Sequence, residues 1–180
     1  MKAPKKSKAG FTLAELMVAS SIAALVSAVG FTLLIFFNSA WRGISLRLQA
    51  DRDVNFAMNY LVYGKGSRLG LRCAVQGADF LKLTQNSGGW SLKYQTRVAD
   101  GQVNTISWSA TDQKLRLNPG DHVLGSDISQ ATMVLSRQPK AGSDSPIIMA
   151  LVTLRVDRVK GRFKARREIA SEVYFRNELL

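Results

Sequence analysis

The fold is decided by residues 11–41, which read FTLAELMVASSIAALVSAVGFTLLIFFNSAW. From Leu16 to Trp41, 26 consecutive residues carry no charge, and this run contains no proline and a single glycine, Gly30. As a helix rising ~1.5 Å per residue it would span about 39 Å, more than the roughly 30 Å of a bilayer's hydrocarbon core. The stretch therefore predicts one membrane-spanning helix, with Trp41 and Arg42 at the interface where the chain leaves the lipid.

A cleaved secretory signal peptide is the main alternative for this end of the chain, because it also combines a basic start with an apolar core. Val26-Ser27-Ala28 would provide the small-residue cleavage site of such a signal. The apolar run, however, continues to Phe37, which is too far for a typical signal. An acid at the start of the run, Glu15, would also bring nothing to a signal core. Both features favour an anchored helix.

Glu15 needs its own explanation, because a carboxylate at the edge of the hydrocarbon is costly and marks a functional candidate. One interpretation is that its side chain reaches back to the lipid headgroups. If the chain began at Phe11, Glu15 would instead lie about one turn from a free amine and a helix N-terminus, and both favour negative charge. In an assembly, the amine of a neighbouring copy could take that place.

The residues around Gly10 add a more specific pattern, in which KAG at 8–10 precedes FTLAELMVA at 11–19. This segment resembles the processing signal of type IV pilins and type II secretion pseudopilins, with Ala14 as a small departure. The resemblance implies that prepilin peptidase cuts after Gly10 and methylates Phe11. It also implies that the helix packs against other pilin or pseudopilin subunits, with Glu15 setting the register of the filament.

The resemblance further implies a single-pass anchor in a bacterial inner membrane, followed by incorporation into a pilus or pseudopilus. The leader, whose four lysines face no acid, would be cytoplasmic and the C-terminal domain periplasmic, in agreement with the positive-inside tendency. The expected divisions are a cleaved basic leader at 1–10, a transmembrane and filament-core helix at 11–41, an amphipathic continuation at 42–63 and an antiparallel β domain at 64–180.

After Trp41, apolar residues recur at roughly helical spacing, although Asp51 and Asn55 interrupt the stripe. We expect the first helix to continue to about Tyr63 and to end in a glycine-rich loop. That loop, GKGSRLG at 64–70, matches neither phosphate-binding glycine pattern. The apolar positions of the stripe are Ile44, Leu48, Met58 and Leu61 or Val62.

Beyond residue 71 the apolar period changes to two, which predicts half-buried antiparallel strands. The clearest hairpin joins 147–157 to 162–176 through Lys160-Gly161, whereas 136–146 is polar and is expected to be a loop. A long N-terminal helix followed by an antiparallel sheet gives an α+β fold, which is also the pilin architecture. The other strands are expected near 90–95, 104–108 and 114–117, with turns at 86–89, 100–101 and 118–121. The closing segment 171–177 resembles that of minor pilins and J-type minor pseudopilins.

The chain has 25 Lys and Arg against 13 Asp and Glu, a net charge of +12, and removal of the leader would leave +8. A basic cluster lies at the C-terminal hairpin, where Arg155 and Arg167 flank the candidate polyanion patch. A solvated sheet surface explains it, and so would a contact with DNA, lipopolysaccharide or an acidic subunit. The alternative function is therefore a DNA-binding pseudopilin of a competence system. The candidate patch is Arg158, Lys160, Arg162, Lys164 and Arg166.

The sequence offers little for catalysis, since it contains one His and one Cys and no GxSxG, HExxH or CxxC motif. We expect no enzyme activity, no cofactor and no metal site. A calcium site from Asp121, Asp127 and Asp144 would lack EF-hand spacing. Cys73 is expected to be a small buried residue in the first strand. The sequence thus predicts a structural subunit, most like a minor pilin or J-type minor pseudopilin.

Overall fold

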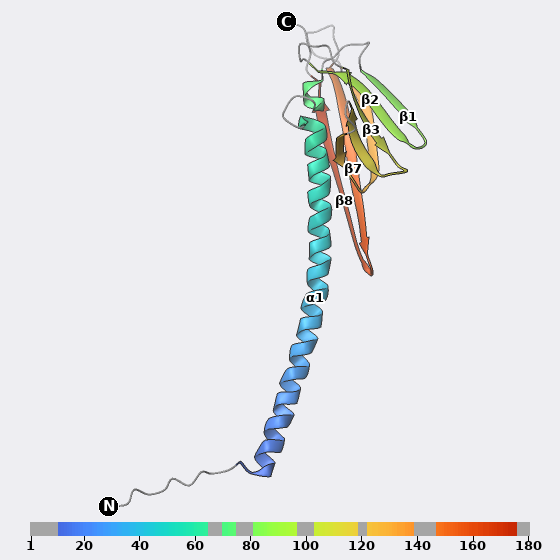
Figure 1. Ribbon diagram of the computed structural model, residues 1–180. Helices are drawn as coiled ribbons and strands as arrows, with labels where there is room; N and C mark the ends of the chain where they lie inside the picture. Colours follow the sequence, from blue (N-terminus) through green and yellow to red (C-terminus); the bar gives the residue numbers. More distant parts are fainter. Residues whose placement is uncertain are drawn as a thin grey trace, which may run out of the picture. The chain divides into compact units, whose positions relative to one another are not determined.

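The computed structural model describes residues 11–64, 70–74, 81–96, 103–118, 122–138 and 147–175 (Figure 1). It confirms the α+β class, with one long helix followed by antiparallel strands. The chain divides into two compact units after Arg42, and each unit is described by itself. The elements are α1 (Leu13–Tyr63), the 3-10 helix η1 (Leu71–Cys73), β1 (Lys82–Asn86), β2 (Gly89–Gln95), β3 (Val103–Ser109), β4 (Lys114–Asn118), β5 (His122–Gly125), β6 (Ile128–Gln138), β7 (Ile147–Lys160) and β8 (Phe163–Tyr174).

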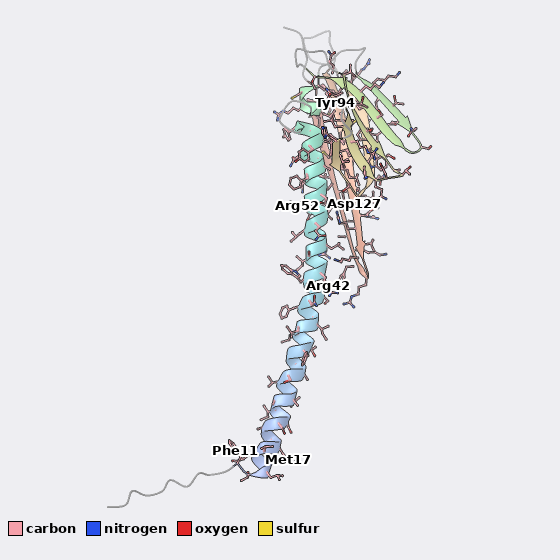
Figure 2. The ribbon with its side chains drawn as sticks, viewed as in Figure 1. Phe11, Met17, Arg42, Arg52, Tyr94 and Asp127 are labelled. Carbon is pink, nitrogen blue, oxygen red and sulfur yellow. The ribbon has the colours of Figure 1, made fainter. Side chains whose placement is uncertain are left out.

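In the first unit, the apolar side chains of α1 radiate on all sides and none of them is buried (Figure 2). Three hydroxyl groups in this part of α1 return to the backbone: Ser20 and Ser21 donate to the Met17 carbonyl at 2.9 and 2.8 Å, and Thr32 donates to the Ala28 carbonyl at 2.9 Å. This part of α1 therefore presents almost only hydrocarbon. In the part of the chain that the structure describes, α1 is the one helix long and apolar enough to cross a membrane.

In the second unit, α1 buries one face against the strands, but the predicted stripe is partly wrong. Ile44 and Leu48 are 50% and 61% exposed. The face that packs passes instead through small residues such as Ala50 and Ala57, because they allow the helix backbone to approach the sheet closely. Hydrophobicity alone ranks alanine below isoleucine and leucine, so the pattern favoured Ile44 and Leu48 over Ala50 and Ala57. The later predicted positions, Met58 and Leu61 or Val62, are buried as expected. The buried residues of α1 are Leu46, Ala50, Val54, Ala57, Met58, Leu61 and Val62.

The strands form two antiparallel sheets, with the order β1-β2-β3-β4-β5 in one and β6-β7-β8 in the other. The predicted alternation is confirmed: Leu92 faces Ile106 across β2 and β3, and both side chains are fully buried. In the second sheet the buried row of β7 includes Val152 and Leu154. These inward faces and the buried face of α1 share one hydrophobic core.

Side chains from the first sheet cover the outer edge of β6. The indole nitrogens of Trp90 and Trp108 each donate at 3.1 Å, to the carbonyls of Ala131 and Ile128 respectively. The Gln85 side-chain amide donates at 2.7 Å to the Met133 carbonyl, which lies further along the same edge of β6. An exposed strand edge is a template for unwanted pairing, so these donors both join the sheets and protect the edge.

Some local predictions need correction. Residues 136–138 continue strand β6 rather than beginning a loop, since they pair with β7; 139–146 lies outside the described residues. Cys73 lies half-buried in η1 rather than in a strand. The end of α1 agrees with expectation, because Gly64 adopts φ 75° and donates its N–H to the Tyr60 carbonyl at 2.8 Å. The predicted turns at 100–101 and 119–121 also lie outside the described residues.

Candidate assembly site and basic hairpin

The first turn of α1 is closed by a reciprocal pair of side chains, Thr12 and Glu15. Glu15 Oε2 accepts hydrogen bonds from the Thr12 N–H at 2.9 Å and from the Thr12 hydroxyl at 3.0 Å. The Glu15 N–H in turn donates to Thr12 Oγ1 at 3.3 Å. This is a capping box, which satisfies N–H groups that no helical carbonyl can reach. Sequence reasoning missed it, although the TLAE spacing at 12–15 is its ordinary signature.

The capping box changes the interpretation of Glu15, since its carboxylate is not an orphan group. Oε2 is occupied by Thr12, whereas Oε1 accepts no hydrogen bond from any residue that the structure describes. Phe11, the predicted methylation site, is 86% exposed and lies one turn away in the chain. Gly10 lies outside the described residues. The helix start thus presents an oriented carboxylate oxygen to a donor from elsewhere.

The predicted polyanion patch is divided between the two faces of the β7–β8 hairpin. Arg158 pairs in register with the buried Ala165, and Lys160 pairs with Phe163, so both lie on the face that carries the core residues. Lys164 and Arg166 are exposed on the opposite face. Arg166 forms an ion pair there with Asp157. Arg162 lies in the turn between the strands. The five residues therefore do not form one continuous surface.

On the core-carrying face, arginines bind acids of α1. Arg158 Nη2 lies 2.6 Å from Asp53 Oδ2 and 3.0 Å from Asp127 Oδ2, which joins α1, β7 and the segment before β6. Arg167 Nε lies 2.6 Å from Asp51 Oδ1. Asp51, which interrupts the apolar stripe in the sequence, is thus the partner of a β8 arginine.

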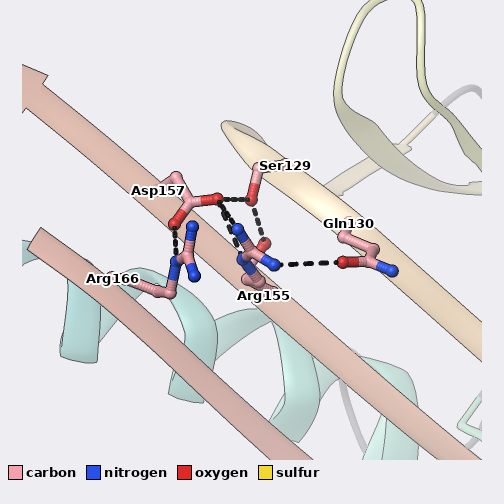
Figure 3. Close-up of polar contacts among 5 residues, drawn as sticks. All are labelled: Ser129, Gln130, Arg155, Asp157 and Arg166. Carbon is pink, nitrogen blue, oxygen red and sulfur yellow. Dashed lines mark hydrogen bonds and ion pairs between the residues drawn. The ribbon is translucent and has the colours of Figure 1, made fainter.

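On the opposite face, Asp157 is the centre of a second network (Figure 3). Arg155 Nε donates to Asp157 Oδ2 at 2.9 Å, and Arg166 Nε donates to Oδ1 at 2.8 Å. Ser129 also donates to Oδ2 at 2.9 Å, while Arg155 reaches Gln130 at 3.3 Å. Desolvation of Asp157 opposes its ionisation, but the hydrogen bonds from Arg155, Arg166 and Ser129 outweigh that effect and lower its pKa to about 2.

After these pairings, the uncompensated positive charge of the hairpin is concentrated at its end. Lys160, Arg162 and Lys164 form no ion pair with any residue in the described ranges. The Arg162 guanidinium lies 5.2 Å above the ring of Phe163, which leaves its charge exposed to solvent. We call Lys160, Arg162 and Lys164 the basic hairpin end.

Metal chemistry finds no support in the described part of the chain, where no group of three or more His, Cys, Asp or Glu side chains converges. Asp127, one of the three candidate calcium ligands, is the ion-pair partner of Arg158. The other two, Asp121 and Asp144, lie outside the described residues. His122 is exposed at the start of β5.

A helix that is capped at its start, uncharged from Leu16 to Trp41 and buried against antiparallel sheets in its second half defines a class of protein: an α+β subunit whose N-terminal helix is long and apolar enough to cross a membrane. The comparison with known families is more specific. Residues 5–31 match the model described as the prokaryotic N-terminal methylation motif, which is the signal of type IV pilins and pseudopilins. The chain therefore carries the N-terminal signal of a pilin-like subunit. Searches of curated proteins and of solved structures found no significant match.

Proposed function

We propose that this chain is a minor pilin or minor pseudopilin, a structural subunit of a type IV pilus or type II secretion filament. Prepilin peptidase cleaves it after Gly10 and methylates Phe11. The observation that carries the proposal is the methylation motif at 5–31, which runs directly into the uncharged half of α1. The motif supplies the peptidase with its cleavage site, and the apolar helix supplies both the membrane anchor and the surface that subunits share.

The same features assign a role to each segment of the chain. We propose that 1–10 is the cytoplasmic leader, 11–41 the membrane and filament-core segment, 42–63 the amphipathic continuation and 64–180 the periplasmic β domain. The lysine-rich leader favours this orientation, because basic flanks remain on the cytoplasmic side. Within the filament, Glu15 pairs through Oε1 with the methylated amine of Phe11 in a neighbouring subunit. In an apolar bundle only the register that neutralises this acid is favoured.

Co-expression with prepilin peptidase tests the proposal directly. We expect the mass of the product to correspond to loss of residues 1–10 plus one methyl group, with Phe11 at the new N-terminus. A Gly10→Val variant should remain uncleaved and still insert in the membrane, which separates processing from anchoring. Cleavage near residue 28, or an unchanged mass with active peptidase, would contradict the proposal.

The positive charge of the β7–β8 hairpin supports the alternative function, DNA binding, less than its composition suggests. Arg155, Arg158, Arg166 and Arg167 are each held by an aspartate, so the hairpin has less free charge for phosphates than its composition suggests. Affinity for nucleic acid depends strongly on such charges. We therefore favour assembly as the function of the chain.

A further inference from the structure

The β7–β8 hairpin ends beside the point where the chain leaves the predicted membrane segment. Phe163, the first residue of β8, packs on Gly43: its Cδ1 atom lies 3.6 Å from the position that a Cβ on Gly43 would occupy. Gly43 follows Trp41, the last residue of the uncharged run, by two residues. Chain connectivity alone therefore places the hairpin end near the membrane surface. Within its own unit, this hairpin extends beyond the ends of the other strands (Figure 1).

The chemistry of this end differs from that of the rest of the hairpin. Further from the turn, arginines on both faces are held by Asp51, Asp53, Asp127 and Asp157. The basic hairpin end has no such partner among the described residues, and its three side chains are exposed. Long basic side chains keep their charge in water or at phosphates while their stems lie along apolar surface.

An exposed apolar residue accompanies the three cations. Val159, which pairs with Lys164 in the register of the hairpin, is 65% exposed. An apolar tip surrounded by lysine and arginine is the composition of segments that rest in the interfacial layer of a bilayer. Because this end of the hairpin lies beside Gly43, it would be close to the surface of a membrane crossed by the segment that ends at Trp41.

We infer that the basic hairpin end binds the anionic phosphate headgroups of the leaflet from which the chain emerges, with Val159 in the interfacial layer. The contact would hold the β unit against the membrane until the subunit enters a filament. This inference rests on the membrane anchor in the proposed function, but not on cleavage or methylation. A nucleic acid offers similar phosphates, yet it would have to approach an anionic lipid surface that repels it.

The test places the full chain in lipid nanodiscs. A fluorophore on Val159→Cys is quenched by lipids with a nitroxide on the headgroup, in discs of phosphatidylcholine alone or with phosphatidylglycerol. We expect quenching at Val159→Cys to increase about fivefold or more with the anionic lipid at low salt, and to fall back at high salt. The matched position is Val103→Cys, which is 45% exposed and pairs with Gln95 in the first sheet; its quenching should not respond. The unsubstituted chain, labelled in parallel, gives the contribution of half-buried Cys73.

Two double variants with equal loss of charge provide the decisive comparison. Lys160→Gln with Lys164→Gln should abolish the response to anionic lipid, whereas Lys82→Gln with Lys93→Gln, which pair on β1 and β2, should retain it. The inference is overturned if neutral and anionic discs quench equally, or if both double variants behave alike. It is also overturned if duplex DNA binds through Lys160 and Lys164 while anionic lipid has no effect. If the chain stays uncleaved in the presence of active prepilin peptidase but still responds to anionic lipid, the proposed processing is refuted and this inference stands.

Discussion

At the first turn of α1, Glu15 has a local role in the structure and a second role that we propose in assembly. Its Oε2 atom closes a capping box with Thr12, and its Oε1 atom is left for a partner outside the described residues. The local task stabilises the helix start, because the cap satisfies N–H groups that no helical carbonyl can reach. The proposed assembly task depends on charge, so variants that separate charge from capping distinguish the two.

Glu15→Gln should insert in the membrane and be cleaved normally, but should enter filaments about tenfold less than the wild-type subunit, as should Glu15→Ala. Glutamine retains an oxygen that accepts from Thr12 and loses the negative charge that a neighbouring amine needs. The measurement is the amount of each subunit in sheared filaments relative to the membrane fraction. Thr12→Val, which removes the hydroxyl of the cap and keeps the acid, is the control and should incorporate well. Normal incorporation of Glu15→Gln would show that capping, not charge, is the essential role.

The low pKa of Asp157 predicts a pH dependence of stability. Its pKa is about 2 in the folded chain, below the ordinary value of 3.8, so its stabilising effect is fully present above about pH 4 and is lost as pH falls toward 2. Asp157→Asn should therefore lower the free energy of unfolding by about 1 kcal/mol at pH 6, after allowance for the solvent exposure of the site. Denaturant unfolding from pH 6 to pH 2 should show the two proteins converging. A difference that stays constant over this range would exclude the ionised network as its cause.

At the scale of elements, two ion pairs join α1 to the hairpin, and they differ in burial. The atoms Asp53 Oδ2 and Arg158 Nε are buried and make no hydrogen bond with any residue in the described ranges, although the two side chains form an ion pair. The Asp51–Arg167 pair is more exposed. We expect Asp53→Ala to cost about 2 kcal/mol, because it leaves the partly buried Arg158 with only the more exposed Asp127 as counter-ion, and Asp51→Ala to cost less than about 1 kcal/mol. Chemical denaturation measures both, and equal costs would contradict this ranking.

The contact between α1 and β5 depends on a small residue at Gly125. A Cβ at this position would lie 2.7 Å from the Cβ of Ala57 and 2.9 Å from Ile128 Cδ1. Gly125→Ala should therefore force the helix and strand apart and lower the free energy of unfolding by about 1–3 kcal/mol. Gly88→Ala is the matched control, since its nearest neighbour would be Asn86 Oδ1 at 3.8 Å. A Gly125→Ala protein as stable as the control would contradict the close approach.

At the scale of the whole molecule, the unit that begins at Gly43 has its own core, to which α1 contributes from Leu46 onward. A fragment of residues 43–180 should therefore unfold cooperatively and remain soluble without detergent. A fragment that starts at Arg52 lacks Leu46, Ala50 and the Asp51 partner of Arg167, and should be less stable by about 3 kcal/mol or more. Thermal unfolding followed by circular dichroism compares them. Equal melting temperatures would show that the first turns of the buried helix face contribute little.

Much of the fold was predictable because its signals are local. The uncharged run, the change of period from helical to two and the turn at Lys160-Gly161 each depend on neighbouring residues, and the structure contains the corresponding helix, strands and hairpin. Met58 and Leu61 or Val62 were predicted to pack, but the burial of Ala50 and Ala57 was not predictable, because it depends on how closely the sheet approaches the helix. Nor was the use of Trp90 and Trp108 as donors to β6, because their acceptors come from a different sheet.

By itself the sequence determined the long apolar helix, the α+β class and the processing motif, since these follow from runs of residues that act together along the chain. Only the tertiary structure decided which charges remain free. Arg155, Arg158, Arg166 and Arg167 look equivalent to Lys160, Arg162 and Lys164 in the sequence, yet among the residues that the structure describes the first four meet aspartates and the last three do not. The physical reason is that an ion pair depends on distance in space, and residues as far apart in the chain as Asp51 and Arg167 become neighbours only when helix and hairpin pack together.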